Sequence, residues 1–128
     1  MTSERRVVSP AEWIAAADAA REEGYDFFDW LSAVDRTGEE PPGFDIALHL
    51  LDVEAPGALR ELLLVARLPA GADLPSLTGI FAGAAWHERE THEMFGIEVT
   101  GFDDGTGLGL RPLLLPDGFE GHPLRKDF

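Results

Sequence analysis

The chain has 128 residues, and its 24 acidic and 10 basic side chains give a formal net charge of −14. Hydrophobic residues make up 45% and charged residues 27% of the sequence, as is typical of one soluble globular domain. The acidic balance excludes nucleic acid and anionic lipid as expected partners, and the absence of cysteine excludes disulfides and cysteine-ligated iron–sulfur clusters.

The N-terminal part of the chain predicts a short strand followed by a helix. The strand lies around residues 7–8, and the helix begins at Pro10, where Ser9 and Glu12 form a capping box. Gly24 fits the position just beyond the helix C-terminus. Small and aromatic residues at helical spacing share one face, so the helix is expected to pack on a sheet.

Extended segments follow in the middle of the chain. Residues 25–36 are aromatic and mixed, which fits either a strand or a short extended turn. Residues 44–53 and 59–68 alternate as strands do, and the short turn between them favours a hairpin. Residues 74–81 are expected to form a short helix after a proline.

The last regular elements are a helix over residues 84–95, ended by Gly96, and a possible short strand over 97–102. Beyond Phe102 the sequence is interrupted by Gly and Pro and has no period, so its order is expected to come from a partner. The predicted fold is α+β, a small mixed sheet packed by two or three helices. A core domain over residues 1–101 precedes an extended irregular C-terminal arm over 102–128.

The charge is unevenly distributed between these two parts. Residues 111–128 contain three bases and three acids, so residues 1–110 carry the whole net charge of −14. One interpretation is a solvated acidic surface that aids solubility. The alternative is that the neutral C-terminal segment lies on another protein.

The stretch "WHERETHEMFG", residues 86–96, is the strongest candidate for chemistry because it approaches a zinc-protease motif. His87 and His92 are five residues apart, which separates them by about 140° around a helix. They therefore cannot bind one metal from one face. Glu88 and His92 have the i, i+4 spacing for a metal, but no third ligand is evident, and a charge pair on the helix is favoured. Arg89 and Glu93 are expected to form a similar pair.

No other motif predicts a catalytic residue, a metal ligand or a cofactor-binding residue. The glycines of residues 103–109 match neither a dinucleotide fingerprint nor a phosphate loop, and the acids there lack EF-hand spacing. His49 and His122 are isolated in the sequence and are interpreted as packed or surface residues.

Two stretches, however, resemble a known pattern. "WHERETHEMFGI" at residues 86–97 is similar to W-x-E-R-E-x-x-D-M-F-G-I, and "LRPLLLPDGFEGHPLRKDF" at residues 110–128 is similar to L-R-R-x-L-L-P-x-D-W-x-G-H-P-L-R-K-D-Y. These patterns are found in the C subunit of bacterial NADH-quinone oxidoreductase, a peripheral subunit family of respiratory complex I. Departures include Glu93 in place of Asp, Pro112 in place of Arg, and a five-residue insertion after Gly101.

The resemblance implies an accessory, non-catalytic subunit in the peripheral arm of a membrane-associated NADH:quinone oxidoreductase. Such a subunit has no redox centre of its own, while the parent complex would use NADH, FMN, iron–sulfur clusters and quinone. Its C-terminal arm would lie along the D subunit of the complex and scaffold the cluster-bearing subunits. The resemblance places the following residues at the partner interface: Glu88, Arg89, Glu90, Phe95, Gly96, Arg111, Phe119, Gly121, His122, Pro123, Leu124, Arg125, Lys126 and Asp127.

Two alternatives stay open at this point. Related chains occur in energy-converting membrane hydrogenases and formate hydrogenlyase, and a small metal-dependent hydrolase built on Glu88 and His92 is the other possibility. The sequence shows no export leader and no apolar run of about 20 residues. The expected location is cytoplasmic, without direct membrane insertion, on the inner face of the membrane through the complex.

Overall fold

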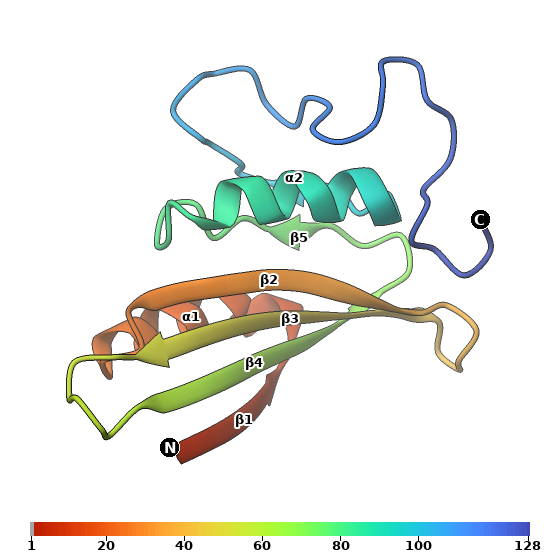
Figure 1. Cartoon of the computed structure of the whole chain (residues 1–128). Helices are drawn as coiled ribbons and strands as arrows, with labels where there is room; N and C mark the ends of the chain where they lie inside the picture. The colour runs from red at the N-terminus through yellow and green to blue at the C-terminus, as the bar shows by residue number, and fades with distance from the viewer. Residues whose placement is uncertain (1) are drawn as a thin grey trace.

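A computed structural model describes residues 2–128 as a four-stranded mixed sheet, two helices and a long C-terminal arm (Figure 1). The predicted α+β class is confirmed. The main sheet has the strand order β1-β4-β3-β2, and a two-stranded sheet pairs β5 with β6. The elements are β1 (Thr2–Val8), η1 (Pro10–Glu12), α1 (Trp13–Glu22), β2 (Phe27–Arg36), β3 (Gly43–Asp52), β4 (Arg60–Pro69), β5 (Leu74–Pro75), α2 (Ala84–Phe95) and β6 (Val99–Thr100).

The first helix forms where its local signals predict it. Ser9 and Glu12 make the capping box, and the Glu12 carboxylate accepts the Ser9 amide at 3.0 Å. The first turn is a 3-10 helix, and α1 continues from it. Trp13, Ala17 and Ala20 are fully buried, so the face identified by helical spacing is the one that packs on the sheet.

The main sheet combines an antiparallel meander with one parallel pair. Strands β2, β3 and β4 are antiparallel neighbours, and the predicted hairpin between β3 and β4 is confirmed. Residues 27–36 form a full strand, which resolves the alternatives left open by the sequence. Strand β1 pairs in parallel with β4 after the chain crosses over through α1, with Thr2 opposite Arg60.

The hydrophobic core lies between one face of this sheet and the helices. Even-numbered residues of β3 and β4, among them Leu48, Leu50, Leu62 and Leu64, are fully buried and contribute to a single cluster with residues of α1 and α2. Each such leucine stabilises the fold by about 1.5–3 kcal/mol relative to an exposed position. The opposite face of the sheet has no helix on it, and α1 is seen behind the strands in Figure 1.

The helix predicted over residues 74–81 is wrong. Leu74–Pro75 instead form the short strand β5, and the amides of Leu74 and Ser76 donate to carbonyls of the β6 region at 2.8 Å each. The Leu77 amide donates to the Glu88 carboxylate at 2.7 Å. Pairing with β6 thus holds the backbone extended at the point where a helix would have begun.

No helix within residues 2–128 is both long and apolar enough to cross a bilayer. Strand β6 is the last regular element, and after it the chain continues as turns and bends. The arm passes over α2 on the side away from the strands (Figure 1). The division between a core over 1–101 and an arm over 102–128 stays a prediction.

Candidate docking site of the C-terminal arm

Helix α2 ends at a glycine whose conformation and surroundings suit no other residue. Gly96 has φ +77°, the left-handed conformation that closes a helix, and its amide donates to the His92 carbonyl at 2.9 Å. A Cβ at Gly96 would lie 2.7 Å from Nε2 of His122. The glycine therefore ends the helix and allows the returning arm to approach it closely.

Glu88 lies fully buried on the inner side of α2. Its carboxylate accepts the Ser76 hydroxyl at 2.6 Å and the Leu77 amide at 2.7 Å. Burial raises the pKa of Glu88, and these two hydrogen bonds only partly oppose that shift. Glu88 fixes the segment before α2 and has no exposed surface to offer a partner.

Arg89 and Glu93 of α2 bind the arm backbone from one helix face. The buried Arg89 guanidinium donates to the carbonyl of Pro112 at 2.7 Å and to that of Arg111 at 3.3 Å. The Glu93 carboxylate accepts three consecutive amides, those of residues 113, 114 and 115, at 3.1, 2.7 and 3.1 Å. Burial opposes ionisation of Glu93, but the three amides outweigh it and lower its pKa.

These contacts replace the helical charge pairs expected from the sequence. Glu88 bonds to Ser76 and Leu77, whereas His92 Nδ1 lies 2.9 Å from the Ile97 carbonyl oxygen. Within residues 2–128 no group of three His, Cys, Asp or Glu side chains is arranged to hold a metal ion. The contacts of Glu88 and His92 therefore give no support to the metal site on which the hydrolase hypothesis depends.

A second set of contacts binds the end of the arm to the sheet. Asp35 of β2 accepts the Lys126 amide at 2.8 Å, although the two residues are 91 positions apart. Burial opposes ionisation of Asp35, but hydrogen bonds from Thr37 and Lys126 outweigh it and lower its pKa to about 2. The Leu124 amide donates to the Met94 carbonyl at 3.1 Å. The arm is thus held in its middle and near its end by side chains and backbone of its own chain.

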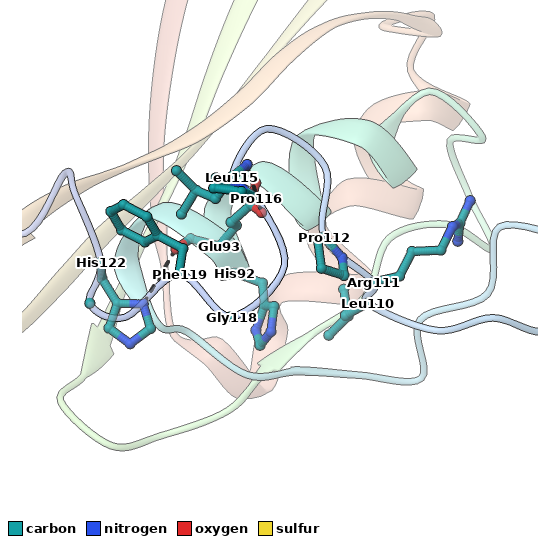
Figure 2. A pocket seen from close by; sticks show the side chains of 11 residues that line it. His92, Glu93, Leu110, Arg111, Pro112, Leu115, Pro116, Gly118, Phe119 and His122 are labelled. Atoms are coloured by element: carbon teal, nitrogen blue, oxygen red, sulfur yellow. Dashed lines mark hydrogen bonds between the residues drawn. The ribbon is translucent and has the colours of Figure 1, made fainter.

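A hollow of about 190 Å³ lies between the arm and the last turns of α2 (Figure 2). Figure 2 shows Glu93, Phe119 and His122 at one end of it and Arg111 at the other. Nδ1 of His122 lies 3.3 Å from the Glu93 carbonyl oxygen. The Arg111 guanidinium donates to the Asp104 carboxylate at 2.8 Å, which closes the glycine-rich loop.

The outer side of the arm exposes large apolar side chains, each between 43 and 67% accessible. Two of them, Phe119 and Phe128, stack with ring centroids 6.3 Å apart. Trp86 of α2 is also exposed and lines a shallow hollow with Leu113 and Leu114. We define the arm surface as Leu108, Leu114, Phe119, Leu124 and Phe128.

The structure separates the predicted interface residues into two groups. Glu88, Arg89 and Phe95 are buried and act inside the molecule, since Phe95 packs edge-on against Phe44 at 6.0 Å. For these three residues too, a role at a partner interface stays a prediction. The others lie on or beside the arm, half-buried or exposed: Glu90, Gly96, Arg111, Phe119, Gly121, His122, Pro123, Leu124, Arg125, Lys126 and Asp127. Their part in an interface stays a prediction.

Sequence reasoning missed two residues that hold the arm. For Glu93 the family pattern offered a signal, because an acidic residue is usual at this position. The expected partner, however, was Arg89 of the same helix and not the arm. Asp35 had none, since an aspartate inside a strand indicates nothing about a contact 91 residues away.

Comparisons with solved structures identify the fold. A trypsin-resistant fragment of Nqo5 matches with a TM-score of 0.68 and 19% identity, over 78% of this chain and 80% of the fragment. A chain of the membrane-bound sulfane sulfur reductase, an archaeal respiratory membrane complex, matches with a TM-score of 0.78 and 23% identity, over 100% of this chain and 72% of the other. The chain thus shares the α+β fold of these two structures.

Sequence comparisons define the family within that fold class. The profile of the respiratory-chain NADH dehydrogenase 30 Kd subunit matches residues 6–128. The NADH-quinone oxidoreductase C subunit of Mesorhizobium japonicum is 40% identical over 103 residues, covering 77% of this chain and 47% of the relative. The Methylobacterium sp. subunit is 36% identical over 126 residues, covering 95% and 54%. The chain belongs to the 30 Kd subunit family of respiratory-chain NADH dehydrogenases, and it spans about half the length of these curated relatives.

Proposed function

We propose that the chain is an accessory, non-catalytic subunit of the peripheral arm of a membrane-associated NADH:quinone oxidoreductase. In this role the arm surface docks on the homologue of the D subunit and keeps the cluster-bearing subunits in register. NADH, FMN, iron–sulfur clusters and quinone are then bound by other subunits. The assembly lies on the cytoplasmic face of the membrane.

The observation that carries this proposal is the combination of an apolar outer side and a fixed backbone in one arm. Large apolar side chains gathered on a surface mark interaction sites in proteins. The arm backbone is already bound by Arg89, Glu93 and Asp35, so little conformational entropy is lost when a partner covers it. Its balanced charge also suits a desolvated contact better than the acidic remainder of the chain.

Arg125 is the polar residue of the arm most suited to this contact. Its guanidinium carbon lies 5.7 Å from the centre of the Phe44 ring, and its Nε lies 3.4 Å from an Asp127 oxygen. That Nε is buried and has no hydrogen-bond partner within residues 2–128. The Arg125 side chain is still 31% exposed, so an acceptor of a partner can bind its exposed part, and truncating such a contact costs about 2–5 kcal/mol.

Affinity purification of the full chain from native membranes tests the proposal. We expect Leu124→Asp and Arg125→Ala each to reduce recovery of the D-subunit homologue at least tenfold, as measured by quantitative mass spectrometry. Val53→Asp is the matched control, because Val53 is exposed and lies before β4, outside the arm. Unchanged recovery for both arm variants at raised salt would refute the proposed docking.

The same purification separates this function from its nearest alternative. The likeness to a chain of an archaeal respiratory membrane complex shows that one fold serves more than one such assembly. The proposed function requires NADH-quinone oxidoreductase subunits to co-purify. Recovery of hydrogenase subunits would instead assign the chain to an energy-converting membrane hydrogenase or formate hydrogenlyase.

A further inference from the structure

The sheet face opposite the helices is a second surface that the proposed docking does not use. It consists of the outward-pointing side chains of β1, β4, β3 and β2, which alternate with the core residues; we call it the open face. The strand register places Val7, Val65, Ala47 and Ser32 in one row across all four strands. No helix or strand of residues 2–128 covers this row.

The open face is more apolar than a solvated sheet face. An antiparallel sheet that faces water on one side normally carries polar residues there. Here Val7, Val34 and Trp30 point outward with accessibilities of 64, 44 and 37%. Leu63 and Ala47 lie half-buried between them. Together with Val65 these side chains form an apolar band across the strands, which Ser32 and His49 interrupt.

The charges at one end of this band are already paired with one another. One oxygen of the Asp45 carboxylate accepts a hydrogen bond from Nε of Arg67 at 2.6 Å, and the other oxygen accepts one from Nε of Arg36 at 3.1 Å. A charge buried without a partner is costly, whereas a paired one can be covered at a smaller cost. Glu39, in the turn after β2, lies 3.3 Å from Arg36 and 3.7 Å from Arg67, so the two guanidiniums at this end share two carboxylates and can lose water at a smaller cost.

At the other end a histidine lies between two carboxylates, next to a hollow. His49 lies between the carboxylates of Asp29 and Glu61, with its two ring nitrogens 2.8 and 3.1 Å from them. Trp30 stacks on the His49 ring at a centroid distance of 5.3 Å. These rings line a hollow of about 360 Å³ that the exposed Arg5 borders. Hollows bordered by Trp and Arg are frequent centres of binding energy in protein interfaces.

The charge balance indicates what kind of molecule covers the open face. It carries three arginines (5, 36 and 67) and three acids (29, 45 and 61), and residues 111–128 also carry three of each. Removing both sets leaves four bases and eighteen acids, which is the entire net charge of −14. The two neutral surfaces are therefore the exceptions on an acidic molecule. Two copies of so acidic a chain would repel each other, which favours a different protein as the occupant.

We propose that the open face docks a second protein subunit of the parent complex, distinct from the one that contacts the arm surface. The inference rests on the proposed function, since it requires a multi-subunit assembly. The arm lies on the helix side of the sheet and the open face on the opposite side, so a flat partner cannot cover both. The second subunit presents an apolar side chain to the hollow and a carboxylate to Arg5.

Site-specific photo-crosslinking in the intact complex tests both surfaces separately. A benzophenone amino acid is placed at Ser32, in the middle of the open face, or at Leu114 on the arm surface, and crosslinked products are identified by mass spectrometry. We expect two different subunits. The same subunit at both positions, a second copy of this chain at Ser32, or only lipid at Ser32 would overturn the inference. If no subunit is crosslinked at Leu114, the proposed arm docking is contradicted. The product at Ser32 still tests the open face in that case.

A matched pair of substitutions completes the test. Val34→Asp adds a charge to the open face, and Ile14→Asp adds the same charge to an exposed apolar position on α1. We expect Val34→Asp to reduce recovery of the Ser32-linked subunit at least tenfold while the arm-linked subunit is retained, and Ile14→Asp to change neither. Thermal unfolding of each purified chain checks folding, and Trp30→Ala is the second variant if Val34→Asp unfolds. Full recovery with a folded open-face variant would overturn the inference.

Discussion

Replacing Glu93 with alanine in the full chain should release the middle of the arm without unfolding the core. The carboxylate accepts the amides of residues 113, 114 and 115 at 3.1, 2.7 and 3.1 Å. A hydrogen bond to a charged group contributes about 1.5–3 kcal/mol. The three bonds share one half-buried carboxylate and are not additive, so we take about 3 kcal/mol for the set. That corresponds to roughly 100-fold faster hydrogen exchange at these amides.

Hydrogen exchange resolved by residue measures this effect. Amides of the β3–β4 ladder should keep their wild-type protection, because the core does not depend on Glu93. Glu90→Ala is the matched control on the same helix, since Glu90 is half-buried as well. Wild-type exchange at residues 113–115 in Glu93→Ala would refute the reasoning that this carboxylate holds the arm.

Because the pKa of Glu93 is shifted, the stability of the arm's attachment to α2 should depend on pH in a known direction. The folded-state pKa is lowered, because the three amides outweigh burial. The stabilisation is therefore complete above the unfolded value of 4.5 and is lost as the pH falls through the folded pKa. Protection at residues 113–115 should decrease on acidification in the wild type and stay low in Glu93→Ala.

Three further predictions concern folding stability, each measured by urea or thermal unfolding. Gly96→Ala should destabilise the chain by about 1–3 kcal/mol, because its φ is +77° and its Cβ meets the arm, while Gly79→Ala, in open space, should stay within about 0.5 kcal/mol. Equal effects would contradict the assigned role. Asp35→Asn should cost about 1.5–3 kcal/mol near neutral pH, and this difference should vanish as the pH falls from 3.8 through about 2; a pH-independent difference would contradict it. Because burial raises the pKa of Glu88, the wild type should lose stability relative to Glu88→Gln as the pH rises above 4.5, and a constant difference would argue against this.

The elements that the sequence predicted well are those with local causes. Helix α1 has its cap, its first proline and its terminal glycine within one short segment, and nothing distant competes for those groups. Strands β3 and β4 form where they were predicted because core-facing residues recur at every second position in each. The family pattern at residues 86–97 and 110–128 identified the family, which the profile match confirms.

The parts that were missed depend on contacts between distant segments. Residues 74–81 have a proline and a capping serine as signals for a helix start, but pairing with strand β6 holds the backbone extended there. The spacing of Arg89 and Glu93 predicts a pair within the helix, yet the arm has five backbone groups there without strand or helix partners. Because backbone polar groups need hydrogen-bond partners, Arg89 and Glu93 bind these groups of the arm and not each other. No spacing rule in the sequence indicates which distant segment supplies those groups.

The parallel pairing of β1 with β4 also bears on how the chain is made. Each β1 residue faces a position far along the sequence, as Thr2 faces Arg60. During synthesis β1 must therefore wait, unpaired, until the β3–β4 hairpin has left the ribosome, and such non-local pairings form slowly. Until then its charged residues, Glu4, Arg5 and Arg6, keep an unpaired strand from joining neighbouring nascent chains. Strand β1 is therefore translated well before the strand it pairs with, and it is among the last to be placed in this sheet.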